Sequence, residues 1–355
     1  MMTHELSGLV DERVALETRL QNEKGELSEE RAHRYENEYG ALQKKLAALF
    51  KQSGDERERI TVMLELMRIL ENRLVYLHNF QVDATPENRL FAQLVTRFID
   101  QIAGTNVLTK LEATYYRGVA ALHSGDVATA QDAFTAACAS EESDEANDIK
   151  YKSYVILGHL SHQERDYARA RELHDQSLRH AQNNNVTAQA LALGALNAYA
   201  LGAHDEALHK FREALQLFDP AQPFFNSYFY RNALLFCGGI SFDRRDYEEA
   251  ETYFRQVLDN ADQTSYDYFD ALTHLGRIHY AQERYDDAAA AFERAIDTHR
   301  FNENEYLVDT WFWIARSHLE RGRADEARAY LEKIAATDVK YEKKPQAVEL
   351  LQKIA

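Results

Sequence analysis

The sequence predicts an all-α fold, an α-solenoid in which antiparallel helix pairs stack in a row. Only 4 Pro and 14 Gly occur in 355 residues, so residues that break helices are scarce. The 20 Tyr and 17 Phe side chains supply large rings for packing one helix on another. A pattern of small and aromatic residues also recurs six times along the chain, which is typical of a repeat architecture.

The recurring pattern is clearest in residues 275–296, LGRIHYAQERYDDAAAAFERAI. Small residues stand at offsets 0 and 12 and a large ring at offset 16, here Gly276, Ala288 and Phe292. The small residues let two helices cross closely, and the ring fills the space between them. The residues at offset 0 in the six units are Gly118, Gly158, Ala195, Gly238, Gly276 and Ala315.

Each unit has a turn between its two helices. The turn residues are Gly125, Arg165, Gly202, Arg245, Glu283 and Gly322. Glycine adopts the left-handed conformation that often ends a helix. Where Arg or Glu takes this place, we expect the turn to use another geometry.

With these residues the chain resembles the tetratricopeptide repeat family. The stretches LGHLSHQERDYARARELHDQS and CGGISFDRRDYEEAETYFRQV carry the resemblance together with residues 275–296. The resemblance implies a right-handed solenoid and a function in protein interaction. The units lie 37 to 43 residues apart, against the family period of 34. In this spacing the chain is similar to kinesin light chains and bacterial peptide-sensing regulators.

The chain divides into four predicted parts. Residues 1–55 form an N-terminal helical segment, 56–107 a helix pair that is a degenerate repeat or cap, 108–340 the six repeats, and 341–355 a capping helix. Apolar residues in 5–50 follow a partial heptad interrupted by Arg13 and Glu23. This favours a helical hairpin or coiled coil, or equally an amphipathic helix packed on the array. We expect KQSGDERER (51–59) to be a linker, Pro86 and Pro345 to open helices, and the array to stay folded without residues 1–55.

Composition excludes several classes of protein. The net charge is -17, with 58 acidic against 41 basic residues, so nucleic acid is an unsuitable partner. No stretch approaches the roughly 20 apolar residues of a membrane span, and no signal peptide is evident, which favours a cytoplasmic protein. Cys138 and Cys237 have no metal-binding spacing, and we predict two buried structural thiols.

A search for chemistry gives no catalytic motif. The sequence has no GxxxxGK[ST], GxGxxG after a strand, GxSxG or HExxH. His159 and His162 share a helix face and could hold a metal with Glu164, but a third ligand is missing, so we favour histidines that line a groove or face solvent. The glycines of CGGIS (237–241) serve helix packing. We predict no catalytic residue, no metal and no cofactor, and therefore a protein that is not an enzyme.

The inner face of the array is the predicted binding site. In the family, positions two, five, nine and twelve of each first helix face inward when the small residue is position eight. The candidate residues are Tyr115, Lys152, His159, His162, Tyr199, Asn232, Phe242, Arg277, Tyr280, Phe312 and Arg316. Their mixture of rings, amides and cations suits an extended peptide of acidic character, or simply keeps the groove soluble. The lysine, asparagine and arginine clamp of chaperone-binding relatives is not found in consecutive units.

The sequence therefore predicts a non-enzymatic scaffold or adaptor that binds a protein or peptide segment in the concave groove. Residues 5–50 would add self-association or a second partner. A peptide- or ligand-sensing regulator, with the N-terminal helices as its effector element, is the alternative. A third hypothesis is an enzyme whose catalytic partner is a separate chain.

Overall fold

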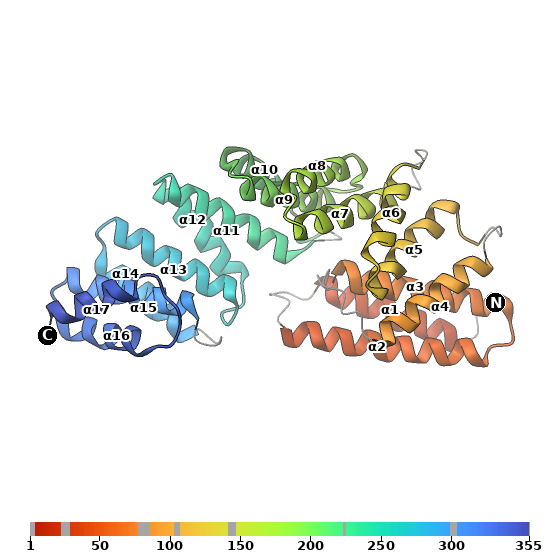
Figure 1. Cartoon of the computed structure of the whole chain (residues 1–355), viewed down its shortest axis with the longest axis horizontal. Helices are drawn as coiled ribbons and strands as arrows, with labels where there is room; N and C mark the ends of the chain where they lie inside the picture. The colour runs from red at the N-terminus through yellow and green to blue at the C-terminus, as the bar shows by residue number, and fades with distance from the viewer. Residues whose placement is uncertain are drawn as a thin grey trace. The chain divides into compact units, whose positions relative to one another are not determined.

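The computed structural model describes residues 4–22, 29–76, 86–102, 107–140, 147–222, 225–298 and 304–354. These residues form helices and connections without any strand, which confirms the all-α class. The chain divides into two compact units, here called the N-terminal unit (Met1–Asn226) and the C-terminal unit (Ser227–Ala355). Figure 1 colours the first from red to green and the second from blue-green to blue.

Four helices and three helix pairs make up the N-terminal unit. Its helices are α1 (His4–Asn22), α2 (Glu29–Gln52), α3 (Glu56–Tyr76), α4 (Pro86–Gln101), α5 (Lys110–Ser124), α6 (Val127–Cys138), α7 (Asn147–Gln163), α8 (Tyr167–Ser177), α9 (Asn184–Ala200) and α10 (His204–Leu217). The pairs of the predicted frame are α5 with α6, α7 with α8, and α9 with α10. In each pair the two helices pack along one another.

Three further pairs and a last helix make up the C-terminal unit. Its helices are α11 (Ser227–Asp243), α12 (Tyr247–Asn260), α13 (Tyr266–Ala281), α14 (Tyr285–Thr298), α15 (Glu305–Glu320), α16 (Ala324–Ala336) and α17 (Lys344–Lys353). The helix that Pro345 was expected to open is present as α17, and its Ala347 packs in one cluster with Val308 and Leu331. The last helix therefore packs against the pair of α15 and α16.

The predicted packing between small residues and rings is confirmed. A Cβ atom on Gly276 would lie 2.6 Å from the Phe292 ring, and one on Gly118 would lie 2.9 Å from Phe134. These distances leave no room for a methyl group, so glycine allows the two helices of a pair to approach. In the pair of α7 and α8 the ring belongs to His174, which is 1 % exposed.

The turns within the pairs differ from expectation. Arg165, Arg245 and Glu283 have φ angles of 62°, 64° and 61°, the left-handed conformation that the turn glycines also adopt. The expectation of another geometry is wrong because the hydrogen bonds that end the first helix dictate the backbone. The Arg245 N–H donates to the Phe242 carbonyl at 2.8 Å, and the next N–H reaches Ser241 at 2.9 Å. A left-handed residue is required between these bonds, whatever its side chain.

The N-terminal helices close their apolar seam inside the chain. Leu6, Leu16, Leu42 and Leu46 are at most 4 % exposed and share a core cluster with residues of α3, such as Val62. A helical arrangement of residues 5–50 was therefore predicted correctly. Because the seam is covered by α3, the described residues leave little of it for self-association.

Two polar residues fix the geometry of these first helices. Arg13, which interrupts the heptad, is 8 % exposed, and its guanidinium binds the Glu65 carboxylate of α3 and Glu17 of α1. The predicted linker 51–59 shrinks to residues 53–55, because the Asp55 carboxylate accepts the Arg57 N–H at 2.9 Å and starts α3 early. As predicted, α4 begins at Pro86.

Candidate functional site

Two predicted inner-face residues of the N-terminal unit are covered by α3. Tyr115 is 1 % exposed, and its hydroxyl donates to Glu71 Oε1 at 3.3 Å. Lys152 Nζ lies 2.6 Å from the same carboxylate and 2.6 Å from Asp148. Burial and Glu71 raise the pKa of Tyr115. Tyr115 is thus a core residue that presents no surface to a partner, contrary to the prediction. The reason is that its hydroxyl is bound by Glu71, a carboxylate of a helix outside the repeats.

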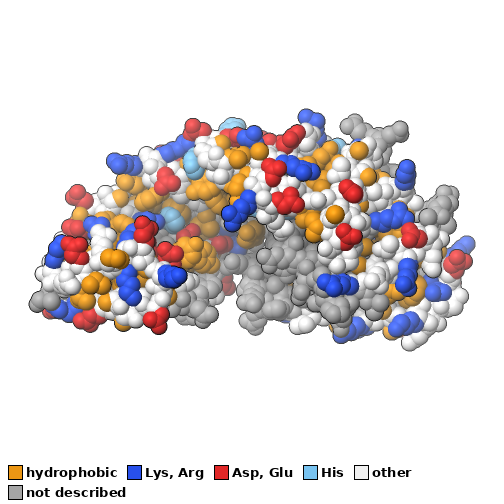
Figure 2. Space-filling view, in the orientation of Figure 1, with side chains coloured by type: hydrophobic (Ala, Val, Ile, Leu, Met, Phe, Trp, Pro, Cys, Tyr) orange, Lys and Arg blue, Asp and Glu red, His pale blue; other side chains and the backbone are white. Residues whose placement is uncertain are grey.

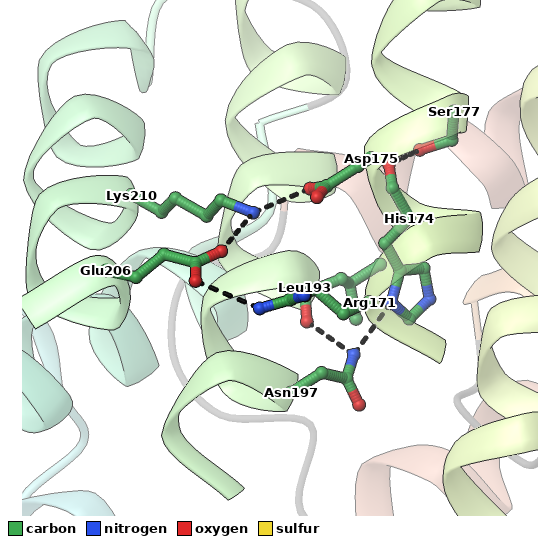
Figure 3. Close-up of polar contacts among 8 residues, drawn as sticks. All are labelled: Arg171, His174, Asp175, Ser177, Leu193, Asn197, Glu206 and Lys210. Atoms are coloured by element: carbon green, nitrogen blue, oxygen red, sulfur yellow. Dashed lines mark hydrogen bonds and ion pairs between the residues drawn. The ribbon is translucent and has the colours of Figure 1, made fainter. Parts of the chain in front are cut away.

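His162 joins a hydrogen-bond network, and His159 packs its ring against a member of that network. His159 packs edge-on against His174 with 5.6 Å between ring centroids. His162 Nδ1 lies 2.8 Å from Asn197 Oδ1, and Asn197 Nδ2 lies 2.9 Å from His174 Nδ1. Figure 3 shows the contact between Asn197 and His174. The network links three successive helices of the array, α7, α8 and α9.

His174 is a neutral core histidine. Burial, with smaller contributions from neighbouring His162 and Lys210, lowers the pKa of its imidazole to about 3. Asn197 Nδ2 is a donor, so His174 Nδ1 accepts, which requires the neutral ring. The side chain stabilises the packing of α7, α8 and α9 only while it stays unprotonated.

A set of ion pairs joins α8 and α10 across α9. Lys210 Nζ lies 2.7 Å from Asp175 Oδ1 and 3.1 Å from Glu206, and Arg171 binds Glu206 at 3.0 Å (Figure 3). A Cβ on Gly194 would lie 3.0 Å from the Asp175 carboxylate. The absence of a side chain at Gly194 therefore leaves space for the ion pairs to cross α9. The acids and bases of this seam neutralise one another, and it offers no unbalanced charge to a ligand. Tyr199, the remaining candidate here, packs its ring on His204 at 4.9 Å.

Rings and arginines alternate on the inner face of the C-terminal unit. We define the aromatic–arginine face as Phe242 of α11, Arg277 and Tyr280 of α13, and Trp313 and Arg316 of α15. The Arg277 guanidinium carbon lies 5.8 Å from the Phe242 ring centroid and 5.5 Å from Trp313. That of Arg316 lies 5.2 Å from Tyr280 and 5.6 Å from Trp313. Four predicted residues are thus brought together around Trp313.

The charge on this face is not fully balanced. Among the described residues no carboxylate lies within ion-pair distance of Arg277, and Arg316 has only Glu320 at 3.8 Å. A guanidinium that stacks its face on rings keeps the N–H groups along its edge for a planar anion. Figure 2 shows hydrophobic side chains gathered over α11 and α13 with cationic side chains close by.

Asp309 of α15 holds a segment of the chain against this face. Its carboxylate accepts from Trp313 Nε1 at 3.0 Å, from the Tyr341 hydroxyl at 2.7 Å and from Lys343 Nζ at 2.6 Å. Tyr341 and Lys343 belong to residues 337–343, the non-helical connection from α16 to α17, which we call the connector. Lys343 Nζ also lies 5.4 Å from the Trp313 ring.

The remaining candidates are less accessible. Phe312 is 1 % exposed and packs on Tyr341 at 6.2 Å, so it is a core residue and offers a partner no surface, contrary to the prediction. The connector covers the inner side of α15 at this position. The amide nitrogen of Asn232 is buried without a hydrogen-bond partner among the described residues.

Other site classes have little support. Among the described residues, no three His, Cys, Asp or Glu side chains are grouped as a metal site, and no helix has the length and apolar character to cross a membrane. Cys237 is buried as predicted, whereas Cys138 is only partly buried; both thiols are free. Burial raises the pKa of Cys138 to about 12, so its thiol is a poor nucleophile at neutral pH.

Comparison with known proteins identifies the repeat. Two models of the tetratricopeptide repeat match residues 241–303 and 309–338. No curated protein matches the chain.

Solved structures are similar in fold. The apo form of RapI matches with a TM-score of 0.56 and 12 % identity, covering 98 % of this chain and 95 % of that one. A signal transduction ATPase of Pyrococcus horikoshii with a tetratricopeptide repeat sensor matches with a TM-score of 0.53 and 12 % identity, covering 89 % and 49 %. A tetratricopeptide repeat protein of Parabacteroides merdae has a TM-score of 0.48 and 20 % identity over 69 % and 85 %. The chain thus contains tetratricopeptide repeats within residues 241–338, and its six helix pairs among the described residues share the fold of this repeat.

Proposed function

We propose that the chain is a non-enzymatic scaffold that binds an extended peptide segment of a partner protein on the aromatic–arginine face. The observation that carries the proposal is Arg277, which stacks between Phe242 and Trp313 without a carboxylate partner among the described residues. A partner supplies that carboxylate as an Asp or Glu side chain or a chain terminus. Rings on both sides of the guanidinium also give the apolar contact that anchors peptide side chains.

The acidic character that we propose for the partner follows from the positive charge of the aromatic–arginine face, not from the net charge of the whole chain. The net charge of -17 repels acidic partners at long range, but this repulsion is screened beyond about 8 Å at physiological ionic strength. At contact distance the partner meets the edges of Arg277 and Arg316, which favour bidentate binding of carboxylates.

The test is affinity capture from the native host with mass spectrometry, followed by titration of synthetic peptides from the captured partner. We expect Arg277→Glu with Arg316→Glu to abolish binding, because both arginines are replaced by repelling charges. Arg255→Glu is the matched control, since Arg255 is an exposed arginine on the second helix α12. Equal loss of binding in the control, or unchanged binding in the double variant, would exclude this face.

A peptide-sensing regulator is the second candidate, favoured by Glu71. This carboxylate of α3 binds Tyr115 and Lys152, so the N-terminal helices already contact the inner side of the first repeats. An effector that displaces Glu71 would release α3 from α5 and α7. Hydrogen exchange of residues 56–76 separates the two functions: a sensor loses protection there when peptide binds, and a scaffold does not.

A further inference from the structure

A three-residue pattern repeats on two successive first helices of the C-terminal unit. DALTHLGR (270–277) of α13 and DTWFWIAR (309–316) of α15 both have Asp at position two, a ring nitrogen at position six and Arg at position nine. In α15, Asp309 accepts from Trp313 Nε1 at 3.0 Å, and in α13, Asp270 Oδ1 lies 3.4 Å from His274 Nδ1. We call these the α13 subsite and the α15 subsite.

The preceding first helix completes each subsite with a ring. Tyr280 of α13 packs on Trp313 at 5.1 Å and lies under Arg316. Phe242 of α11 packs on His274 at 6.3 Å and lies under Arg277. The two subsites therefore share composition and geometry, shifted by one repeat.

The connector shows what the α15 subsite binds. A turn, in which the Lys344 N–H donates to the Tyr341 carbonyl at 3.1 Å, presents the Tyr341 hydroxyl and, two residues later, the ammonium of Lys343, and both reach Asp309. Tyr341 is 8 % exposed, so its ring is held as firmly as a core residue. The bound sequence is therefore Tyr-x-Lys in a non-helical conformation.

The α13 subsite has the same acceptor without such a donor pair. No lysine, arginine or tyrosine hydroxyl of the described residues binds the Asp270 carboxylate, which is 26 % exposed, and His274 is 24 % exposed. On the preceding first helix α11, a Cβ on Gly239 would meet no atom within 4 Å, so the surface at Gly239 is open.

We propose that the α13 subsite binds a turn of a partner segment in which a tyrosine is followed two residues later by a lysine, with Asp270 accepting from both. The inference rests on the proposed function and names the ligand more closely. The lysine and the hydroxyl reach Asp270, and an acidic residue of the same segment reaches Arg277. The Tyr-Glu-Lys sequence at 341–343 combines all three groups.

The probe is a labelled synthetic peptide of the connector, TDVKYEKK (337–344), titrated into the full chain by fluorescence anisotropy. We expect Asp270→Asn to weaken its binding about tenfold or more, since charge-assisted hydrogen bonds are lost. The variant keeps its fold because His274 still bonds to the Asp270 backbone carbonyl at 3.0 Å. Asp270→Lys should instead bind a peptide in which the lysine that corresponds to Lys343 is replaced by Glu.

Asp287→Asn removes an exposed carboxylate of the second helix α14 and is the matched control, which should leave peptide affinity within about twofold. Asp309→Asn tests the α15 subsite separately. Unchanged affinity in Asp270→Asn, or a loss found only in Asp309→Asn, would overturn the inference, the second because the peptide then merely displaces the connector. If Arg277→Glu abolishes binding of an acidic peptide while Asp270→Asn changes nothing, the proposed function stands and this assignment fails. If Arg277→Glu has no effect on either peptide, the proposed function fails.

Discussion

Two neighbouring glycines of α11 have different physical reasons to be glycine. A Cβ on Gly238 would lie 2.8 Å from the Phe254 ring, whereas one on Gly239 would meet nothing within 4 Å. We expect Gly238→Ala to lower the free energy of unfolding by about 1–3 kcal/mol through overpacking. Gly239→Ala should raise it by roughly 0.5–1 kcal/mol, because alanine favours a helix interior. Urea unfolding of both variants measures this, and a shift of the same sign in both would contradict it.

The left-handed turn residues are a second residue-scale test. A non-glycine residue in this conformation costs roughly 1–2 kcal/mol, and Arg245 and Glu283 both adopt it. Glycine removes that strain but gains freedom in the unfolded chain, so Glu283→Gly should stabilise the fold by about 0.5–1 kcal/mol. Thermal unfolding reports the change. The same substitution at a helical surface position of α14, Glu293→Gly, should destabilise by roughly 1 kcal/mol.

At the scale of elements, the packing of α7, α8 and α9 should depend on pH through His174. Its pKa falls from 6.5 to about 3 on folding, so between these values only the unfolded chain binds the proton. The stabilising contribution is complete above pH 6.5 and is lost as pH falls, by up to about 1.4 kcal/mol per pH unit.

His174→Phe should remove this dependence, because phenylalanine takes the same place against the glycine of other pairs. Unfolding free energies of both proteins at pH 7 and pH 5 provide the measurement. An equal loss in both proteins would show that other groups cause it.

Elements of the array could be predicted from sequence because their packing is local. Gly276 and Phe292 lie sixteen residues apart on two adjoining helices. The helical periodicity determines which face of each helix they occupy, so their contact follows from the spacing. Asp309 was within reach too, since it occupies position two of its helix. The contact between Asp309 and the connector could not be predicted, because Tyr341 lies outside the repeat pattern and its position depends on how the chain folds back onto α15.

Contacts from outside the frame also limited the prediction of the site. Glu71 lies 44 residues from Tyr115, in a helix with no repeat pattern, so spacing gives no sign that it covers the inner side of α5. Trp313 at position six was missed because the family rule assigns that position no inward role, although its large ring reaches both arginines.

At the scale of the whole molecule, the two units use their inner faces differently. In the N-terminal unit α3 meets the first repeats through Glu71, and the acids and bases of the seam between α8 and α10 are paired. In the C-terminal unit Arg277 keeps its edge available. The proposed binding face therefore lies in the C-terminal unit alone, although the repeat frame runs through both units.

Deleting residues 1–55 should cause self-association, in contrast to the expectation from sequence. The deletion uncovers Val62 and Leu66 of α3, which are at most 2 % exposed, and removes Arg13 from the buried Glu65. An exposed apolar helix face is unfavourable, and Glu65 is left with Arg68 as its ion-pair partner. Light scattering after size exclusion measures the mass; a monomer with an unchanged melting temperature would restore the original expectation.

The connector covers the inner side of the pair formed by α15 and α16. A stack of identical units has no internal reason to stop, and an uncovered last unit would accept another unit or another molecule. Tyr341 and Lys343 occupy Asp309 with groups of the chain's own, and α17 follows directly. The chain thus covers α15 with a segment of its own, and a repeat inserted directly after α16 would separate this segment from Asp309 and leave that carboxylate open to another chain.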